Sequence, residues 1–263
     1  MAEYEYILFA QQDHVAWITL NRPEVLNAMH PPMADELREA WTRVRDDDDI
    51  WMAVLTGSGE RAFSAGSDLK WRAEQGGKVR EHNRDEVVTN EALGFQRGRD
   101  CWKPLLAAVH GYAVGGGLEL VLGCDIVLAA DNAQFGLPEV RRGLMADGAG
   151  IHRLVRRVPY SVAMGMVLTG QFIGAEEAHR VGLVNEVTSG EELRAATERW
   201  VAQIMECAPL SLRASKEAAL RGLELPLWEA VGQSFPMAEK LYASEDFIAG
   251  PEAFAEKRKP EWK

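Results

Sequence analysis

One short segment constrains the fold of this chain more than any other. It joins an apolar run of strand length, Leu105–Val109, to glycines at 115–117 and then to an apolar run, 118–122, that contains Glu119. Glycine leaves its backbone amide unobstructed, and an amide at the start of a helix lies at the positive end of the helix dipole. We therefore predict a strand, a turn and a buried helix, with the amide of Gly116 in an oxyanion hole beside a general acid or base. The alternative is a glycine turn that only packs against a neighbouring helix.

A second apolar run, residues 51–56, also ends in a loop of small residues, which includes the stretch Phe-Ser-Ala-Gly-Ser at 63–67. Two such loops can each direct one backbone N–H at the same carbonyl oxygen, so we expect the amides of Ser67 and Gly116 to act together. A third segment places Glu139 directly after Pro138, and proline is favoured in the first turn of a helix. Glu119 and Glu139 are thus a candidate pair of catalytic carboxylates. Their alternatives are a solvent-facing helix glutamate and an acid favoured at a helix start by the dipole.

The order of patterns along the chain predicts an α/β fold with a helical C-terminal region. Residues 6–20 are typical of a hairpin, and Met33, Leu37, Trp41 and Val44 recur at helical spacing. Strand and helix patterns alternate to about residue 190, which predicts a core over residues 1–190 and a helical region over 191–263. Residues 72–100 are polar and weakly periodic, and they indicate a mobile loop or a loosely packed helix.

Charge and cysteine content exclude several classes of protein. The net charge of −11 over 263 residues argues against a nucleic-acid partner, because such proteins need a basic surface. The dense basic clusters, 141–142 and 257–259, are short, although they suit a phosphorylated ligand. Three widely spaced cysteines indicate a reduced compartment, and the sequence has neither a secretory signal at its start nor an apolar run of membrane-spanning length. We therefore expect a cytoplasmic protein with no membrane partner.

The sequence offers no pattern for a bound metal or a nucleotide cofactor. The aspartates at 46–49 are typical of a solvated turn, and the alternative, a cation site, would require alternating spacing. The six histidines have no ligand spacing, and the dinucleotide and phosphate-loop fingerprints are absent from the sequence. We expect no metal and no cofactor.

In their order and spacing, these three segments resemble the crotonase superfamily, and within it the enoyl-CoA hydratase branch. The resemblance extends to further segments and covers essentially the whole chain: 21–23, 26–28, 168–170, 175–178, 182–185 and 253–259. It implies a crotonase-type spiral of repeated strand-strand-helix units. It also implies that the C-terminal helical region joins chains into homotrimers, which often pair into hexamers.

The resemblance implies the reversible addition of water across the 2,3 double bond of a trans-2-enoyl-CoA, with coenzyme A as part of the substrate. The thioester oxygen would lie between the amides of Ser67 and Gly116, while Glu119 activates water and Glu139 protonates the α carbon. Two carboxylates that share one water are not easily both ionised, so one should have a raised pKa. The implied CoA contacts are Leu26, Ala28, Ala65, Ser67, Asp68, Leu69, Lys70 and Gly116, with Phe254 and Lys257 from an adjacent chain. The alternative for the last two is an ordinary amphipathic helix.

Asp147 departs from the hydratase pattern, which usually has glycine or another small residue there. Together with the stretch 244–251, an acid at this position resembles carnitinyl-CoA dehydratases. Asp147 then either pairs with a cationic or polar group of the substrate or caps the helix expected near Gly148. Ser67 is a milder departure, because it replaces the usual alanine while its amide remains available.

Three functions stay open. The first is hydration, the second is another reaction of the superfamily (carnitinyl-CoA dehydration, isomerisation or hydrolysis), and the third is a non-catalytic scaffold or RNA-binding relative. The presence of both Glu119 and Glu139 favours hydration. Trp71, Trp102 and Trp228 either line an acyl pocket or belong to the core and subunit contacts.

Overall fold

The computed structural model describes residues 4–74, 94–97 and 100–263. These residues form two compact units. The first comprises the described residues up to 97 together with 105–197, and the second comprises 100–104 and 198–263. Most of the segment 72–100, for which a loop or loose helix was expected, lies outside the described residues.

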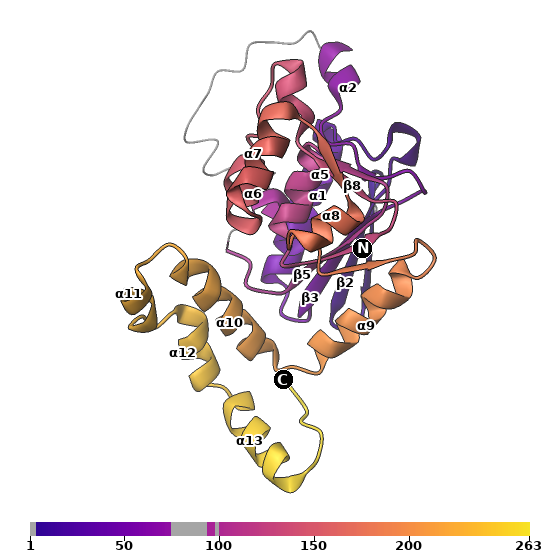
Figure 1. Cartoon of the computed structure of the whole chain (residues 1–263). Helices are drawn as coiled ribbons and strands as arrows, with labels where there is room; N and C mark the ends of the chain where they lie inside the picture. Colours follow the sequence, from indigo (N-terminus) through magenta and orange to yellow (C-terminus); the bar gives the residue numbers. More distant parts are fainter. Residues whose placement is uncertain (1–3, 75–93, 98–99) are drawn as a thin grey trace. The chain divides into compact units, whose positions relative to one another are not determined.

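The first unit contains two β-sheets (Figure 1). The six-stranded sheet has the order β1 (Ile7–Gln12), β2 (Val15–Leu20), β3 (Met52–Gly57), β5 (Leu105–Val109), β7 (Ile126–Ala130) and β10 (Glu186–Thr188). The four-stranded sheet has the order β4 (Ala62–Ser64), β6 (Tyr112–Val114), β8 (Gln134–Gly136) and β9 (Phe172–Gly174). The helical segments of this unit are η1 (Pro23–Val25), α1 (Pro31–Asp46), α2 (Leu69–Glu74), α4 (Gly94–Arg97), α5 (Gly116–Gly123), η3 (Pro138–Arg142), α6 (Gly150–Arg157), α7 (Tyr160–Thr169) and α8 (Ala175–Arg180).

Successive strands alternate between the two sheets. Each of the pairs β3 and β4, β5 and β6, and β7 and β8 contributes one strand to each sheet, and a helical segment follows each pair. The parallel strand β5 is buried along its whole length, as expected for a strand whose two faces are both covered. The predicted repetition of strand-strand-helix units in an α/β fold is therefore confirmed.

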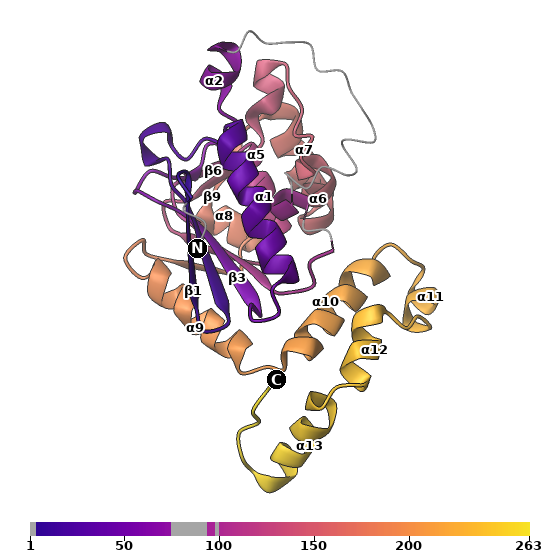
Figure 2. The same cartoon turned by 180° about the vertical axis from the view of Figure 1, so that it is seen from behind.

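The predicted N-terminal elements are also present. β1 and β2 form an antiparallel hairpin that turns at Asp13, where φ is +51°. The apolar positions that recur in α1 are all buried, so this amphipathic helix packs its apolar face against the core beside the first sheet (Figure 2).

The second unit is helical. Its helices are the C-terminal part of α9 (Leu193–Met205), α10 (Pro209–Gly222), α11 (Leu227–Val231), α12 (Pro236–Tyr242) and α13 (Asp246–Glu256). Buried Glu217 joins α10 to α12, since its carboxylate accepts a 2.6 Å hydrogen bond from the amide of Met237. The boundary between the units falls within α9, between residues 197 and 198, a few residues after the predicted boundary at 190/191.

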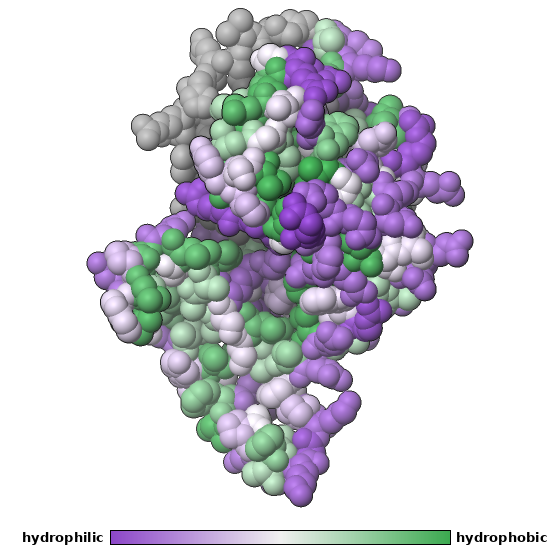
Figure 3. Space-filling view, viewed as in Figure 1, coloured by the Kyte–Doolittle hydropathy of each residue, from purple (hydrophilic) through white to green (hydrophobic). Residues whose placement is uncertain are grey.

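Large apolar side chains are exposed on this second unit. Leu223, Trp228 and Phe254 are each at least 80% exposed, and apolar side chains gather on the surface of the second unit in Figure 3. Across the described parts of the chain, none of the helices combines the length and apolar character needed to cross a bilayer.

Candidate active site

The glycine turn leads into α5, a helix whose residues are all buried. Gly115 is the N-cap residue and has a φ of +57°, a conformation that glycine adopts without strain. Its carbonyl accepts a 3.1 Å hydrogen bond from the amide of Glu119. Because the C=O and N–H of a trans peptide point in opposite directions, the N–H of Gly116 points outward from the start of the helix. The turn therefore presents this amide on the side away from the helix.

The second predicted donor, the amide of Ser67, lies in the loop after β4, where Ser67 forms an isolated β-bridge with Met29. The Met29 amide donates to the carbonyl of Gly66 at 2.7 Å, and the Asp68 amide donates to the carbonyl of Met29 at 2.8 Å. The same trans-peptide geometry points the N–H of Ser67 away from Met29. A Cβ atom added to Gly66, which has a φ of +81°, would lie only 2.7 Å from the nitrogen of Gly116. The structure thus brings the two loops predicted to form the hole into contact.

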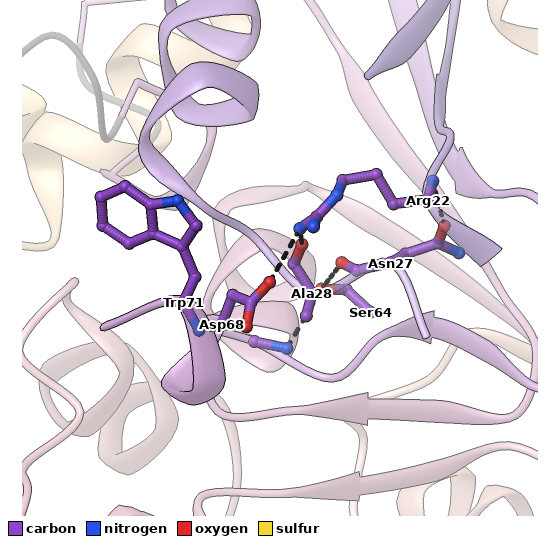
Figure 4. Close-up of polar contacts among 7 residues, drawn as sticks. Arg22, Asn27, Ala28, Ser64, Asp68 and Trp71 are labelled. Carbon is purple, nitrogen blue, oxygen red and sulfur yellow. Dashed lines mark hydrogen bonds and ion pairs between the residues drawn. The ribbon is translucent and has the colours of Figure 1, made fainter. Parts of the chain in front are cut away.

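An ion pair supports the loop that carries Ser67 (Figure 4). Nη1 of Arg22 donates to the carbonyl of Ala28 at 2.5 Å and to Oδ2 of Asp68 at 3.1 Å, while Oδ1 of Asp68 accepts from the amide of Trp71 at 3.0 Å. Burial alone would raise the pKa of Asp68, but the Trp71 amide and the Arg22 guanidinium outweigh burial and lower it. Asp68 is therefore held as the anion at the start of α2.

A buried asparagine fastens the neighbouring loop to β4. Nδ2 of Asn27 donates to the backbone carbonyls of Ser58 and Ala62 at 2.9 Å each. The backbone carbonyl of Asn27 accepts a hydrogen bond from the hydroxyl of Ser64 at 2.8 Å. Next to it, the Ala65 amide donates to the carbonyl of Leu26 at 2.9 Å. Apart from Gly116 on α5, the predicted CoA contacts of the first unit therefore lie in two adjacent loops and at the start of α2: Leu26, Ala28, Ala65, Ser67, Asp68, Leu69 and Lys70. Of these, Ser67, Leu69 and Lys70 are exposed.

Glu119 is 5% exposed, and Oε1 accepts a 2.9 Å hydrogen bond from the amide of Gly150 at the start of α6. A Cβ atom added to Gly148 would lie 2.4 Å from Oε2, so the chain at this point fits closely around the carboxyl group. Burial raises the pKa of Glu119 to about 7, although the Gly150 amide opposes the rise. The nearby charges of Glu139 and Asp147 raise it further.

Glu139 lies in the first turn of η3, as its position after Pro138 predicted. A Cβ atom added to Gly115 would lie 3.0 Å from Oε1, so this carboxyl group sits against the glycine turn. Oε2 is buried, and no hydrogen bond reaches it from any residue that the structure describes. Burial raises the pKa of Glu139, the charge of Asp147 adds to the rise, and its own backbone amide and Arg142 oppose it. Both carboxyl groups of the pair thus have a raised pKa, rather than one alone.

Asp147 is exposed, and its charge acts on both glutamates. The capping alternative for this residue was wrong: α6 begins at Gly150, and its N-cap is Ala149, which forms no side-chain capping bond. The first amide of α6 is bound by Glu119 instead. Sequence reasoning missed this role of Gly148 and Gly150, although two glycines beside an acid in a predicted loop were a possible signal.

The other predicted residues lie elsewhere. Phe254 is 86% exposed, and Lys257 has a φ of +57° as the C-cap of α13, so both belong to the second unit, and their role in the site of an adjacent chain stays a prediction. Trp102 also belongs to that unit, where Arg221 lies over its ring at 5.2 Å. Within the described residues, no group of three or more His, Cys, Asp or Glu side chains is arranged to hold a metal ion.

The chain is similar to known proteins over nearly its whole length. A family model described as enoyl-CoA hydratase/isomerase matches residues 10–263. The chain is 40% identical to (E)-benzylidenesuccinyl-CoA hydratase of Thauera aromatica, over 94% of this chain and 95% of the relative. It is 41% identical to carnitinyl-CoA dehydratase of Escherichia coli K12, over 94% of both chains. The crystal structure of an enoyl-CoA hydratase from Mycobacterium tuberculosis superposes with a TM-score of 0.88, at 36% identity and 98% coverage of each chain.

Proposed function

The chain belongs to the enoyl-CoA hydratase/isomerase family, and from this premise we propose that it catalyses the reversible hydration of a trans-2-enoyl-CoA. The observation that carries the proposal is the pair of carboxyl groups beside the glycine turn at Gly115: Glu119 is buried, and half-buried Glu139 has its Oε2 atom buried. Hydration needs a group that takes a proton from water and a group that gives a proton to carbon, and this pair supplies both. Coenzyme A is the part of the substrate by which the enzyme binds it, and no separate cofactor takes part.

In the proposed reaction, the amides of Ser67 and Gly116 donate to the thioester oxygen and stabilise the negative charge that develops on it. Glu119 accepts a proton from water while the water oxygen bonds to the β carbon. Glu139 gives a proton to the α carbon, and the double bond becomes a single bond. The pKa of Glu119, about 7, suits proton transfer near neutral pH, because a group titrating in that range is available in both forms. Burial raises the pKa of Glu139 as well, which favours the protonated form that gives a proton to carbon.

The test follows the loss of the conjugated enoyl-thioester absorbance with crotonyl-CoA and with longer or branched enoyl-CoAs. We expect Glu119→Gln and Glu139→Gln each to lower kcat by roughly 100-fold or more, the usual contribution of general acid or base catalysis. Glu176→Gln, at an exposed position on α8, is the matched control and should keep the wild-type rate. The proposal fails if the wild type turns over none of these substrates, or if either glutamine variant retains the full rate.

Asp147 favours a second candidate, the dehydration of carnitinyl-CoA, the activity named for the Escherichia coli relative. Its carboxylate is exposed and lies close enough to act on the pKa of both Glu119 and Glu139. A cationic group on the acyl chain would be attracted to this third acid, whereas a neutral chain would gain nothing from it.

Two isosteric enoyl-CoA substrates distinguish the candidates, one ending in a trimethylammonium group and the other in a tert-butyl group. If Asp147 selects a cation, the wild type should prefer the charged substrate by roughly tenfold in kcat/KM, equal to about 1.4 kcal/mol of transition-state binding. Asp147→Asn should remove that preference. If the ratio of kcat/KM for the charged substrate to kcat/KM for the neutral one is the same in the wild type and in Asp147→Asn, Asp147 has no role in selecting the substrate.

We also propose that the active form is a homotrimer or a hexamer built from such trimers. Support comes from the exposed apolar side chains of the second unit, including Leu223, Trp228 and Phe254. Sedimentation velocity measures the assembly directly, and a monomer at micromolar concentration would contradict this part of the proposal.

A further inference from the structure

Helix α6, whose first amide binds Glu119, is also attached to the C-terminal end of α5. Arg153 of α6 donates from Nη1 to the carbonyl of Leu122 at 3.0 Å. One turn later, Arg157 donates to the carbonyls of Cys124 and Asp125 at 2.5 and 2.8 Å. Helices end with carbonyls that have no partner within the helix, and cations are favoured at that end. Arg153 and Arg157 therefore cap the C-terminal end of α5.

These contacts set the two helices side by side in the same direction. The amide of Gly150 meets Glu119 in the first turns of α5 and α6, and the arginines meet carbonyls at residues 122–125 as both helices proceed. α6 is thus tied to α5 at both ends, once through its first amide and again through its guanidinium groups.

The start of α6 needs such an attachment. Its N-cap Ala149 has a φ of +87°, in the left-handed region that costs an alanine roughly 1 kcal/mol, and forms no side-chain capping bond. Burial lowers the pKa of both Arg153 and Arg157. Hydrogen bonds from a partly desolvated guanidinium are strong, and their loss would leave buried carbonyls without a partner.

We propose that Arg153 and Arg157 are positioning residues for Glu119, which fix α6 against the end of α5 and so keep the chain at Gly148 and Gly150 in place around the Glu119 carboxyl group. The inference rests on the catalytic role proposed for Glu119. Two charged groups of the described residues act on Glu119: Glu139 on η3 and Asp147 in the following turn. Neither of them takes part in the attachment of α6 to α5.

The direction of a pKa change separates positioning from general loosening. The amides of Gly150 and Gly148 lower the pKa of Glu119, whereas burial raises it. If the arginines hold the amides in place, their loss moves the titration of Glu119 to higher pH. If they only stabilise the fold, loosening admits water and moves the titration to lower pH.

The experiment compares Arg157→Met and the milder Arg157→Lys with Arg156→Met. Arg156 is the matched control, because it lies on the same helix but is exposed, and among the described residues it donates only within α6, to the carbonyl of His152 at 2.8 Å. Lysine retains the charge but cannot reach two carbonyls with a planar fork, so it should give a partial effect.

Two readouts are needed. The first is the pH dependence of kcat and KM. We expect Arg157→Met to lower kcat by roughly tenfold and to leave KM nearly unchanged, because small misplacements of groups in an active site are costly. The acid limb of the pH–rate profile should move to higher pH. The second is the infrared carboxyl band that disappears in Glu119→Gln, whose titration should move in the same direction. The Arg156 control should match the wild type in both.

Unchanged titration and kcat in the Arg157 variants, or a shift to lower pH, would overturn the inference. If Arg157→Met does not fold, Arg157→Lys and Arg153→Lys carry the same comparison. If the wild type has no turnover, the proposed function fails, but the infrared titration still decides whether the arginines position Glu119.

Discussion

Replacing Glu119 by glutamine should change the pH dependence of stability in a way that can be worked out from the structure. The pKa of Glu119 rises from 4.5 to about 7 on folding, chiefly through burial. Below pH 4.5 the group is protonated in both the folded and the unfolded chain. As the pH rises from 4.5 to 7, the unfolded chain ionises while the folded chain keeps its proton, so the wild type loses stability.

The size of the loss follows from the two pKa values. A difference of about 2.5 units at about 1.4 kcal/mol per unit gives about 3 kcal/mol by pH 8. Glutamine is neutral throughout and its amide oxygen can still accept from Gly150, so the variant does not show this loss. Relative to the wild type, Glu119→Gln should therefore gain about 3 kcal/mol between pH 4.5 and 8.

Urea unfolding at one fixed protein concentration, repeated from pH 4.5 to 8.5, measures this difference. Glu252→Gln, at an exposed position on α13, is the control and should change stability by less than about 0.5 kcal/mol. A gap between wild type and Glu119→Gln that stays constant, or that grows as the pH falls, would refute the argument that Glu119 is buried at an energetic cost above neutral pH.

Four further substitutions test the packing around the site and elsewhere in the first unit. Gly148→Ala places a Cβ atom 2.4 Å from the flexible end of the Glu119 side chain. Activity should therefore fall by at least about tenfold, while the midpoint of thermal unfolding changes little. Full activity would contradict the close fit of the chain around this carboxyl group. In Gly117→Ala the added Cβ atom meets the backbone of β4 at 2.3 Å and should destabilise the protein by about 2 kcal/mol. In Gly165→Ala no atom of the described residues lies within 4 Å of the added Cβ atom, so this change should stabilise α7 by about 0.5 kcal/mol. Equal unfolding midpoints for the two variants would contradict this packing. Arg22→Met should cost about 2 kcal/mol in urea unfolding, because it leaves Asp68 without its ion-pair partner, and an unchanged midpoint would argue against that contact.

Much of the site was readable from the sequence because its signals are local. A run of apolar residues specified β5, three glycines specified the turn after β6, and Pro138 specified the helical turn that carries Glu139. Backbone conformation near glycine and proline depends mostly on the residue itself, so these elements could be predicted without knowledge of the fold. The apolar face of α1 was readable for the same reason, since helical periodicity is a property of neighbouring residues.

The tertiary structure alone decided what surrounds Glu119. The Gly150 amide that binds its carboxyl group is 31 residues away in the sequence, and the arginines that hold α6 reach carbonyls at a similar separation. The capping role considered for Asp147 was wrong because it was inferred from a local preference, whereas a distant side chain had taken the first amide of the helix. Burial, which raises the pKa of both glutamates, likewise depends on elements that meet only when the chain is folded. The sequence thus determined which groups are present, and packing determined their protonation and their partners.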